Sequence, residues 1–131
     1  MTALPIEEVV RDYLRGDSEL MTLLDNEPSR LNAEYKGNIK ATHVTLYRAG
    51  GFMNEYVPID SALVTFHCYG TTRSVAARLA EELARALRDI TLYSWPLQTA
   101  AVQSIGYLPA GDGTARYVVT ASVTRTLASA A

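Results

Sequence analysis

Apolar residues recur at helical spacing in two short segments at the start of the chain. The first segment has the i, i+3, i+4, i+7, i+8 spacing of one helix face, at Ile6, Val9, Val10, Tyr13 and Leu14. Gly16 ends this segment, and Asp17 and Ser18 form an N-cap signal for a second one, which carries apolar residues at positions 20, 21, 23 and 24. The pattern predicts two short helices before residue 25.

Two later stretches lack a clear period. Residues 25–40, DNEPSRLNAEYKGNIK, are rich in Asn, Pro and Gly and predict a long connection with little regular structure. Residues 50–60, GGFMNEYVPID, predict a loop or arm that carries Phe52, Met53 and Tyr56. Aromatic residues and Met are enriched in interfaces, although a loop folded back on its own core explains these three residues equally well.

Alternating β-branched, aromatic and polar residues predict four strands, at residues 43–48, 62–69, about 98–108 and 115–127. In the second strand, Val64, Phe66 and Cys68 share one face, because successive side chains point to opposite faces. The pair Asp112-Gly113 favours a tight reversal between the last two strands. We therefore expect these two strands to form an antiparallel hairpin.

A long amphipathic helix follows the second strand directly. Thr71 or Thr72 can cap it, and its apolar stripe consists of Val75, Ala76, Leu79, Ala80, Leu83, Ala86, Leu87 and Ile90. Its outer face offers two weak i, i+4 ion pairs, Arg78 with Glu82 and Glu81 with Arg85. The element order predicts an α+β fold: a mixed or antiparallel sheet of about four strands, covered on one side by the long helix, with two short N-terminal helices.

Length and composition indicate one folded domain, which we expect to span residues 1–131. The chain is 48% hydrophobic and 20% charged, with a net charge of −2. This charge lacks the broad basic field of nucleic-acid-binding proteins, so we expect no sequence-specific nucleic-acid partner. The apolar runs are far shorter than a bilayer span, and a single cysteine agrees with a reducing compartment. We expect no membrane association.

Candidate chemistry is sparse. The chain has two histidines and one cysteine, and adjacent His67 and Cys68 point to opposite faces of one strand. These residues assemble neither a zinc site nor a nucleophile with its base. We expect no catalytic, cofactor-binding or metal site and no enzyme activity. The alternative is a small enzyme or ligand-binding domain that uses His67, Cys68 and Tyr69 at the strand end.

The segments VVRDYLRGDSELMTLL, HVTLYRAGG, VPIDSALVTFHCYGTTRSVAARLAEELARAL and YVVTASVTRTL resemble, in order and phrasing, the tail terminator proteins of long-tailed bacteriophages. These are also called tail completion or minor tail proteins. The resemblance covers about residues 6–126, and residues 25–42 match poorly. It implies a structural virion subunit, made in the host cytoplasm, that forms a homo-oligomeric ring, commonly a hexamer. The ring caps the tail tube protein, ends tail polymerisation and joins the tail to the head connector protein, and DNA passes through it.

The resemblance implies no catalytic residue. It points to the arm at residues 50–58 and the hairpin at residues 109–116 as contacts between subunits or rings. Our candidate contact residues are Arg48, Phe52, Met53, Tyr56, Asp112, Arg116 and Arg125. A neighbouring head-tail connector component of similar size is the alternative within structural proteins.

Overall fold

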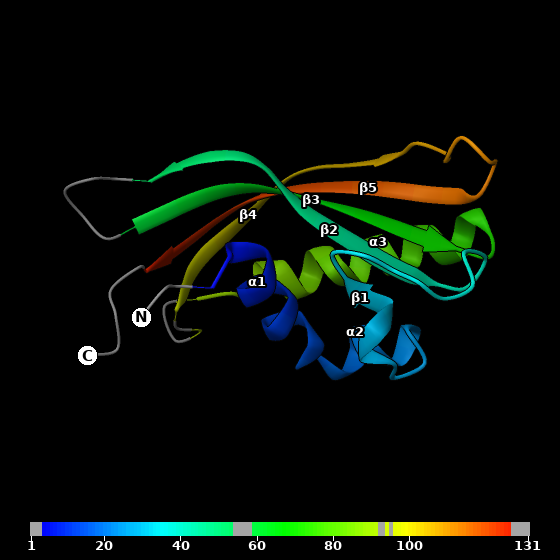
Figure 1. The fold of residues 1–131 in the computed structure, drawn as a ribbon, viewed down its shortest axis with the longest axis horizontal. Helices are drawn as coiled ribbons and strands as arrows, with labels where there is room; N and C mark the ends of the chain where they lie inside the picture. Colours follow the sequence, from blue (N-terminus) through cyan, green and yellow to red (C-terminus); the bar gives the residue numbers. More distant parts are fainter. Residues whose placement is uncertain (1–3, 54–58, 92–93, 95, 127–131) are drawn as a thin grey trace.

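The computed structural model describes residues 4–53, 59–91, 94 and 96–126, and Figure 1 shows their arrangement. The elements are α1 (Ile6–Arg15), α2 (Ser18–Leu23), the 3-10 helix η1 (Pro28–Arg30), β1 (Leu31–Asn32), β2 (His43–Met53), β3 (Ile59–Gly70), α3 (Arg73–Arg88), β4 (Leu97–Tyr107) and β5 (Ala115–Thr126). The strands form one mixed sheet in the order β1-β2-β3-β5-β4, in which only β1 pairs in parallel. The predicted α+β class is confirmed, with a fifth short strand added.

The two N-terminal helices lie where the sequence predicted them. Pro5 precedes α1, and Gly16 stands at its C-terminal cap. The Asp17 side chain caps α2 by accepting a hydrogen bond from the backbone N–H of Leu20 at 3.0 Å. Ile6, Val10 and Leu14 are buried, as the helical spacing requires.

The long helix α3 is capped by Thr72, whose hydroxyl oxygen accepts a hydrogen bond from the Val75 N–H. Val75 itself is 37% exposed, so its place in the predicted apolar stripe is wrong. The ion pairing also differs: Arg85 contacts Glu82 at 3.0 Å and Asp17 at 2.7 Å in place of Glu81. The contact with Glu82 is local, at i, i+3 within α3, whereas the contact with Asp17 is tertiary, because the N-cap carboxylate of α2 lies against this side of α3.

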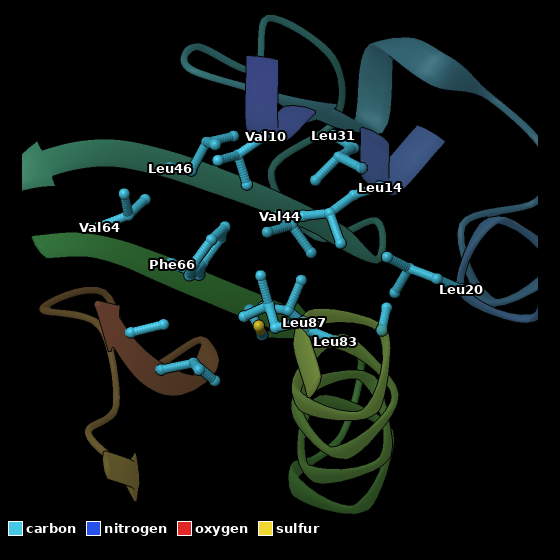
Figure 2. Close-up of a cluster of buried hydrophobic side chains, with 14 of the residues drawn as sticks. Val10, Leu14, Leu20, Leu31, Val44, Leu46, Val64, Phe66, Leu83 and Leu87 are labelled. Carbon is cyan, nitrogen blue, oxygen red and sulfur yellow. The ribbon is translucent and has the colours of Figure 1, made fainter. Parts of the chain in front are cut away.

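All three helices lie on one face of the sheet, as Figure 1 shows. Between the two layers, Leu83 and Leu87 of α3 approach Phe66 of β3, while Val10 and Leu14 of α1 approach β2 (Figure 2). Val64, Phe66 and Cys68 are fully buried, which confirms the predicted inner face of β3. The leucines of α3 and the inner face of the sheet therefore form one hydrophobic core.

Strand β2 is longer than predicted. The expected loop begins at residue 50, but Gly50–Met53 continue the pairing with β3 after a bulge between Arg48 and Gly50. Gly51 adopts φ +116°, and a Cβ atom there would lie 2.1 Å from the carbonyl oxygen of Ser61. Gly51 thus supplies a backbone conformation and a close approach that other residues would not allow, and β2 continues past the bulge where the glycine-rich sequence predicted its end.

The connection at residues 25–40 and the end of β4 also differ from the expectation, whereas the reversal between β4 and β5 does not. The connection at residues 25–40 is not wholly irregular, because it contains η1 and β1, and Leu31 is fully buried. The predicted reversal between β4 and β5 is confirmed, with Gly113 at φ +86° and a hydrogen bond from its N–H to the Ala110 carbonyl oxygen. Leu108 lies outside β4, in the loop before the turn.

Candidate interaction surface

The face of the sheet opposite the helices is open. On β3 it carries Ser61, Leu63, Thr65, His67 and Tyr69, which alternate with the positions of the inner face; of these five, only Thr65 is buried. The facing positions of β5 carry Val118, Thr120, Ser122 and Thr124. Apart from Arg116 at one end, the described strand residues of this face carry neutral side chains. This hydroxyl-rich face lies outside the hydrophobic core, and another molecule can contact it.

The sheet has a free edge on each side. Strand β4 pairs with β5 on one side, and its sequence LQTAAVQSIGY contains neither a charged residue nor proline. On the other side of the sheet, β1 covers β2 only at Val44 and Thr45. Among the described residues, positions 46–53 of β2 therefore pair with β3 on one side and have no strand on the other. Edge strands that stay unpaired are usually protected by charges, prolines or bulges. Two register shifts are the only such feature of β4.

Two of the predicted contact residues, Arg48 and Arg125, both contact the buried carboxylate of Asp60. Arg48 donates two hydrogen bonds to the carboxylate of Asp60, at 3.0 and 2.8 Å. The Arg125 Nε atom lies 3.4 Å from the same carboxylate, and its guanidinium donates a hydrogen bond to the Leu4 carbonyl oxygen. Asp60 is fully buried and Arg125 is 6% exposed. The cluster joins the N-terminal segment, β2, β3 and β5 at one end of the sheet.

Sequence reasoning missed Asp60, although the alternation contains its signal. Asp60 lies two and four residues before Ala62 and Val64, so its side chain belongs to the inner face of β3. A carboxylate at a core position needs charged or hydrogen-bonding partners, and Arg48 and Arg125 supply them.

The remaining arm residues are placed only in part. Phe52 and Met53 belong to β2 and not to a loop, and their backbones pair with Ser61 and Asp60. Tyr56 lies outside the described residues. The contact roles of these three residues stay predictions.

The predicted hairpin contacts, Asp112 and Arg116, lie at the opposite end of the sheet from Asp60. The Asp112 side chain accepts a hydrogen bond from the Thr114 N–H at 2.9 Å, which lowers the pKa of its carboxyl. Arg116 donates to the Leu108 carbonyl oxygen at 2.8 Å and lies 3.3 Å from Nδ1 of His67. Asp112 is exposed and Arg116 is half-buried. Both residues are held by their own hairpin, and their contact roles stay predictions.

Aromatic side chains gather at the same end. The His43 ring is stacked between Tyr35 and Tyr69, with centroid distances of 4.1 and 4.4 Å. Burial lowers the pKa of both histidines, and for His67 the nearby Arg116 lowers it further. Both imidazoles are therefore neutral near pH 7. The sequence offered no signal for this stack, because Tyr35 comes from a connection without periodicity.

The strand-helix corner does not expose its cysteine thiol. Cys68 is fully buried, and burial raises the pKa of its thiol. His67 is half-buried on the open face, opposite Cys68, as predicted. In the described part of the chain, no three His, Cys, Asp or Glu side chains lie close enough together to hold a metal ion. None of the described helices is long and apolar enough to cross a membrane.

These features define a small α+β domain whose mixed sheet is covered on one face and open on the other. The same fold occurs in a chain of the virion of a native gene transfer agent particle, with a TM-score of 0.67. The match covers 93% of this chain and 94% of that chain, at 13% sequence identity, so the likeness is one of fold. No model of a known protein family and no curated protein sequence matches this chain.

Proposed function

We propose that this protein is a structural virion protein of a long-tailed phage, and specifically the tail terminator. Its likeness in fold to a chain of the virion of a native gene transfer agent particle, over nearly the whole length of both chains, carries the proposal. The sequence resemblance to tail terminators supports the same role. The protein would cap the tail tube, end its polymerisation and join it to the head connector.

The free sheet edges support assembly into a ring. Strand β4 presents an uncharged edge at one side of the sheet, and β2 presents residues 46–53 at the other. Because the two edges differ, a copy that docks its β2 edge on the β4 edge of its neighbour leaves one edge of each kind free. Head-to-tail contacts of this kind close into a ring when the rotation between copies is fixed. We propose a hexamer.

The buried Cys68 supports the structural role over the alternative of a small enzyme. A thiol with a raised pKa and no exposure is a poor nucleophile, because the thiolate is the reactive form. His67 lies on the other face of β3 and cannot serve as its base from there.

Electron microscopy of the purified protein, alone and mixed with a tail tube protein of a long-tailed phage, tests the proposal. We expect six-fold rings, and tubes that stop growing when the protein is added. A protein that stays monomeric at all concentrations and neither binds nor caps tubes would refute the terminator role. Rings that bind the head connector but leave tube growth unchanged would identify a connector component in its place.

A further inference from the structure

Three loops meet at the end of the sheet that is remote from Asp60. They are residues 33–42, 70–72 and 108–114, and they lie at the right of Figure 1. Two depressions of about 550 and 440 Å³ adjoin at Asp112 and Thr114, one on the side of α3 and one on the side of β2. We call them together the loop groove.

The loop groove is locally positive in an acidic protein. Lys40 and Arg73 line its larger half, and Lys36 and Arg116 lie in the adjoining loop and hairpin. Lys36 and Lys40 are the two lysines of the chain. The first turn of α3 begins with Arg73 and contains no acidic residue, although acidic residues are favoured at that end of a helix. The carboxylates near the groove are Glu34 and Asp112.

Aromatic contacts hold the walls of the groove in place. On the smaller side the wall is the Tyr35–His43–Tyr69 stack, in which the His43 ring is neutral near pH 7. On the larger side the Arg73 guanidinium lies 4.2 Å from the centre of the Tyr107 ring. A preformed groove with aromatic walls binds a partner at a lower cost in conformational entropy.

We propose that the loop groove docks an extended acidic segment of a neighbouring virion protein. The carboxylates of the segment lie against Lys40 and Arg73, and its apolar atoms lie against Tyr35 and Tyr107. The nature of the partner rests on the proposed function, whereas the acidic character of the segment rests on the groove alone. Charge complementarity of this kind selects partners and steers their encounter.

The groove favours a protein segment over DNA. Asp112 is exposed in the middle of the groove and repels phosphate, whereas a protein segment can offer Asp112 a donor. A few cations beside two carboxylates are also far from the dense basic surface that releases counterions from duplex DNA.

The test compares two charge reversals in the full-length protein. Lys40→Glu changes a side chain of the groove, and Arg78→Glu makes the same change of charge on the exposed face of α3, outside the groove. The probe is a fluorescein-labelled short peptide of alternating glutamate and tyrosine, followed by anisotropy. We expect Lys40→Glu to weaken binding by about tenfold and Arg78→Glu to change it by less than about twofold. In the wild-type protein, bound peptide should protect Lys40, which lines the groove, from acetylation.

Equal losses in the two variants, or no binding of the peptide, would overturn the inference. Tighter binding of a short DNA duplex, lost in Lys40→Glu, would overturn it in favour of nucleic acid. Electron microscopy of Lys40→Glu separates this inference from the proposed function. If Lys40→Glu forms rings but does not bind the peptide, the terminator proposal still stands. If the wild-type protein binds the peptide but forms no ring, the proposal for the loop groove still stands.

Discussion

The buried carboxylate of Asp60 offers a sharp test of what holds one end of this fold together. Replacing Asp60 by asparagine keeps the size of the side chain and removes its charge. The change leaves Arg48 and Arg125 without a counterion. Arg125 is 6% exposed, so its charge cannot be rehydrated without moving β5 or the N-terminal segment.

The expected loss follows from these contacts. Asp60→Asn weakens two charge-assisted hydrogen bonds from Arg48, at 3.0 and 2.8 Å, and the ion pair with Arg125 at 3.4 Å. Breaking a buried ion pair by removing one partner costs about 3–5 kcal/mol. For a domain of 131 residues we expect the melting temperature to fall by about 11–18 °C.

Urea denaturation followed by circular dichroism measures the loss. Asp12→Asn is the matched control, because Asp12 pairs with Arg11 at 3.0 Å on the surface, and we expect it to cost less than about 1 kcal/mol. The double variant Asp60→Asn with Arg125→Met should recover part of the stability, since it removes the buried unpaired charge. Equal costs for Asp60→Asn and Asp12→Asn, or no recovery in the double variant, would refute this account.

Three further outcomes follow from the same structure. In urea denaturation, Gly51→Ala should lower the free energy of unfolding by more than about 1 kcal/mol, because Gly51 has φ +116° and the Ser61 carbonyl oxygen leaves no room for a Cβ atom. Gly50→Ala is the control and should be nearly neutral, because a Cβ atom at Gly50 would lie in open space. Because the pKa values of His43 and His67 are lowered in the folded protein, the unfolded chain binds more protons below about pH 6.5. The urea midpoint should therefore stay level above about pH 6.5 and fall as the pH drops below it. A midpoint that rises on acidification would contradict the burial of these rings. Native Cys68 should react with a thiol reagent orders of magnitude more slowly than in urea, and rapid native labelling would revive the reactive interpretation of the strand-helix corner.

Periodicity by itself determined most of the elements of this protein. The spacing of Val10 and Leu14, the alternation around Phe66 and the cap at Thr72 each depend on neighbours within a few positions of the chain. Local geometry decides which face of a helix or strand such residues present, so the two-layer α+β arrangement was predictable. The separation of His67 from Cys68 was predictable for the same reason.

Only the tertiary structure decided the pairings between distant segments. Strand β5 lies between β3 and β4, which leaves the β4 edge free. Asp60 lies among arginines from β2 and β5, and Tyr35 joins the stack on His43 from a connection without any periodic pattern. Such contacts join residues far apart in the sequence, and each is decided by the packing of the whole chain. The local sequence restricts the conformation of each segment but does not specify which distant segment it meets, because that choice depends on the free energy of the complete core.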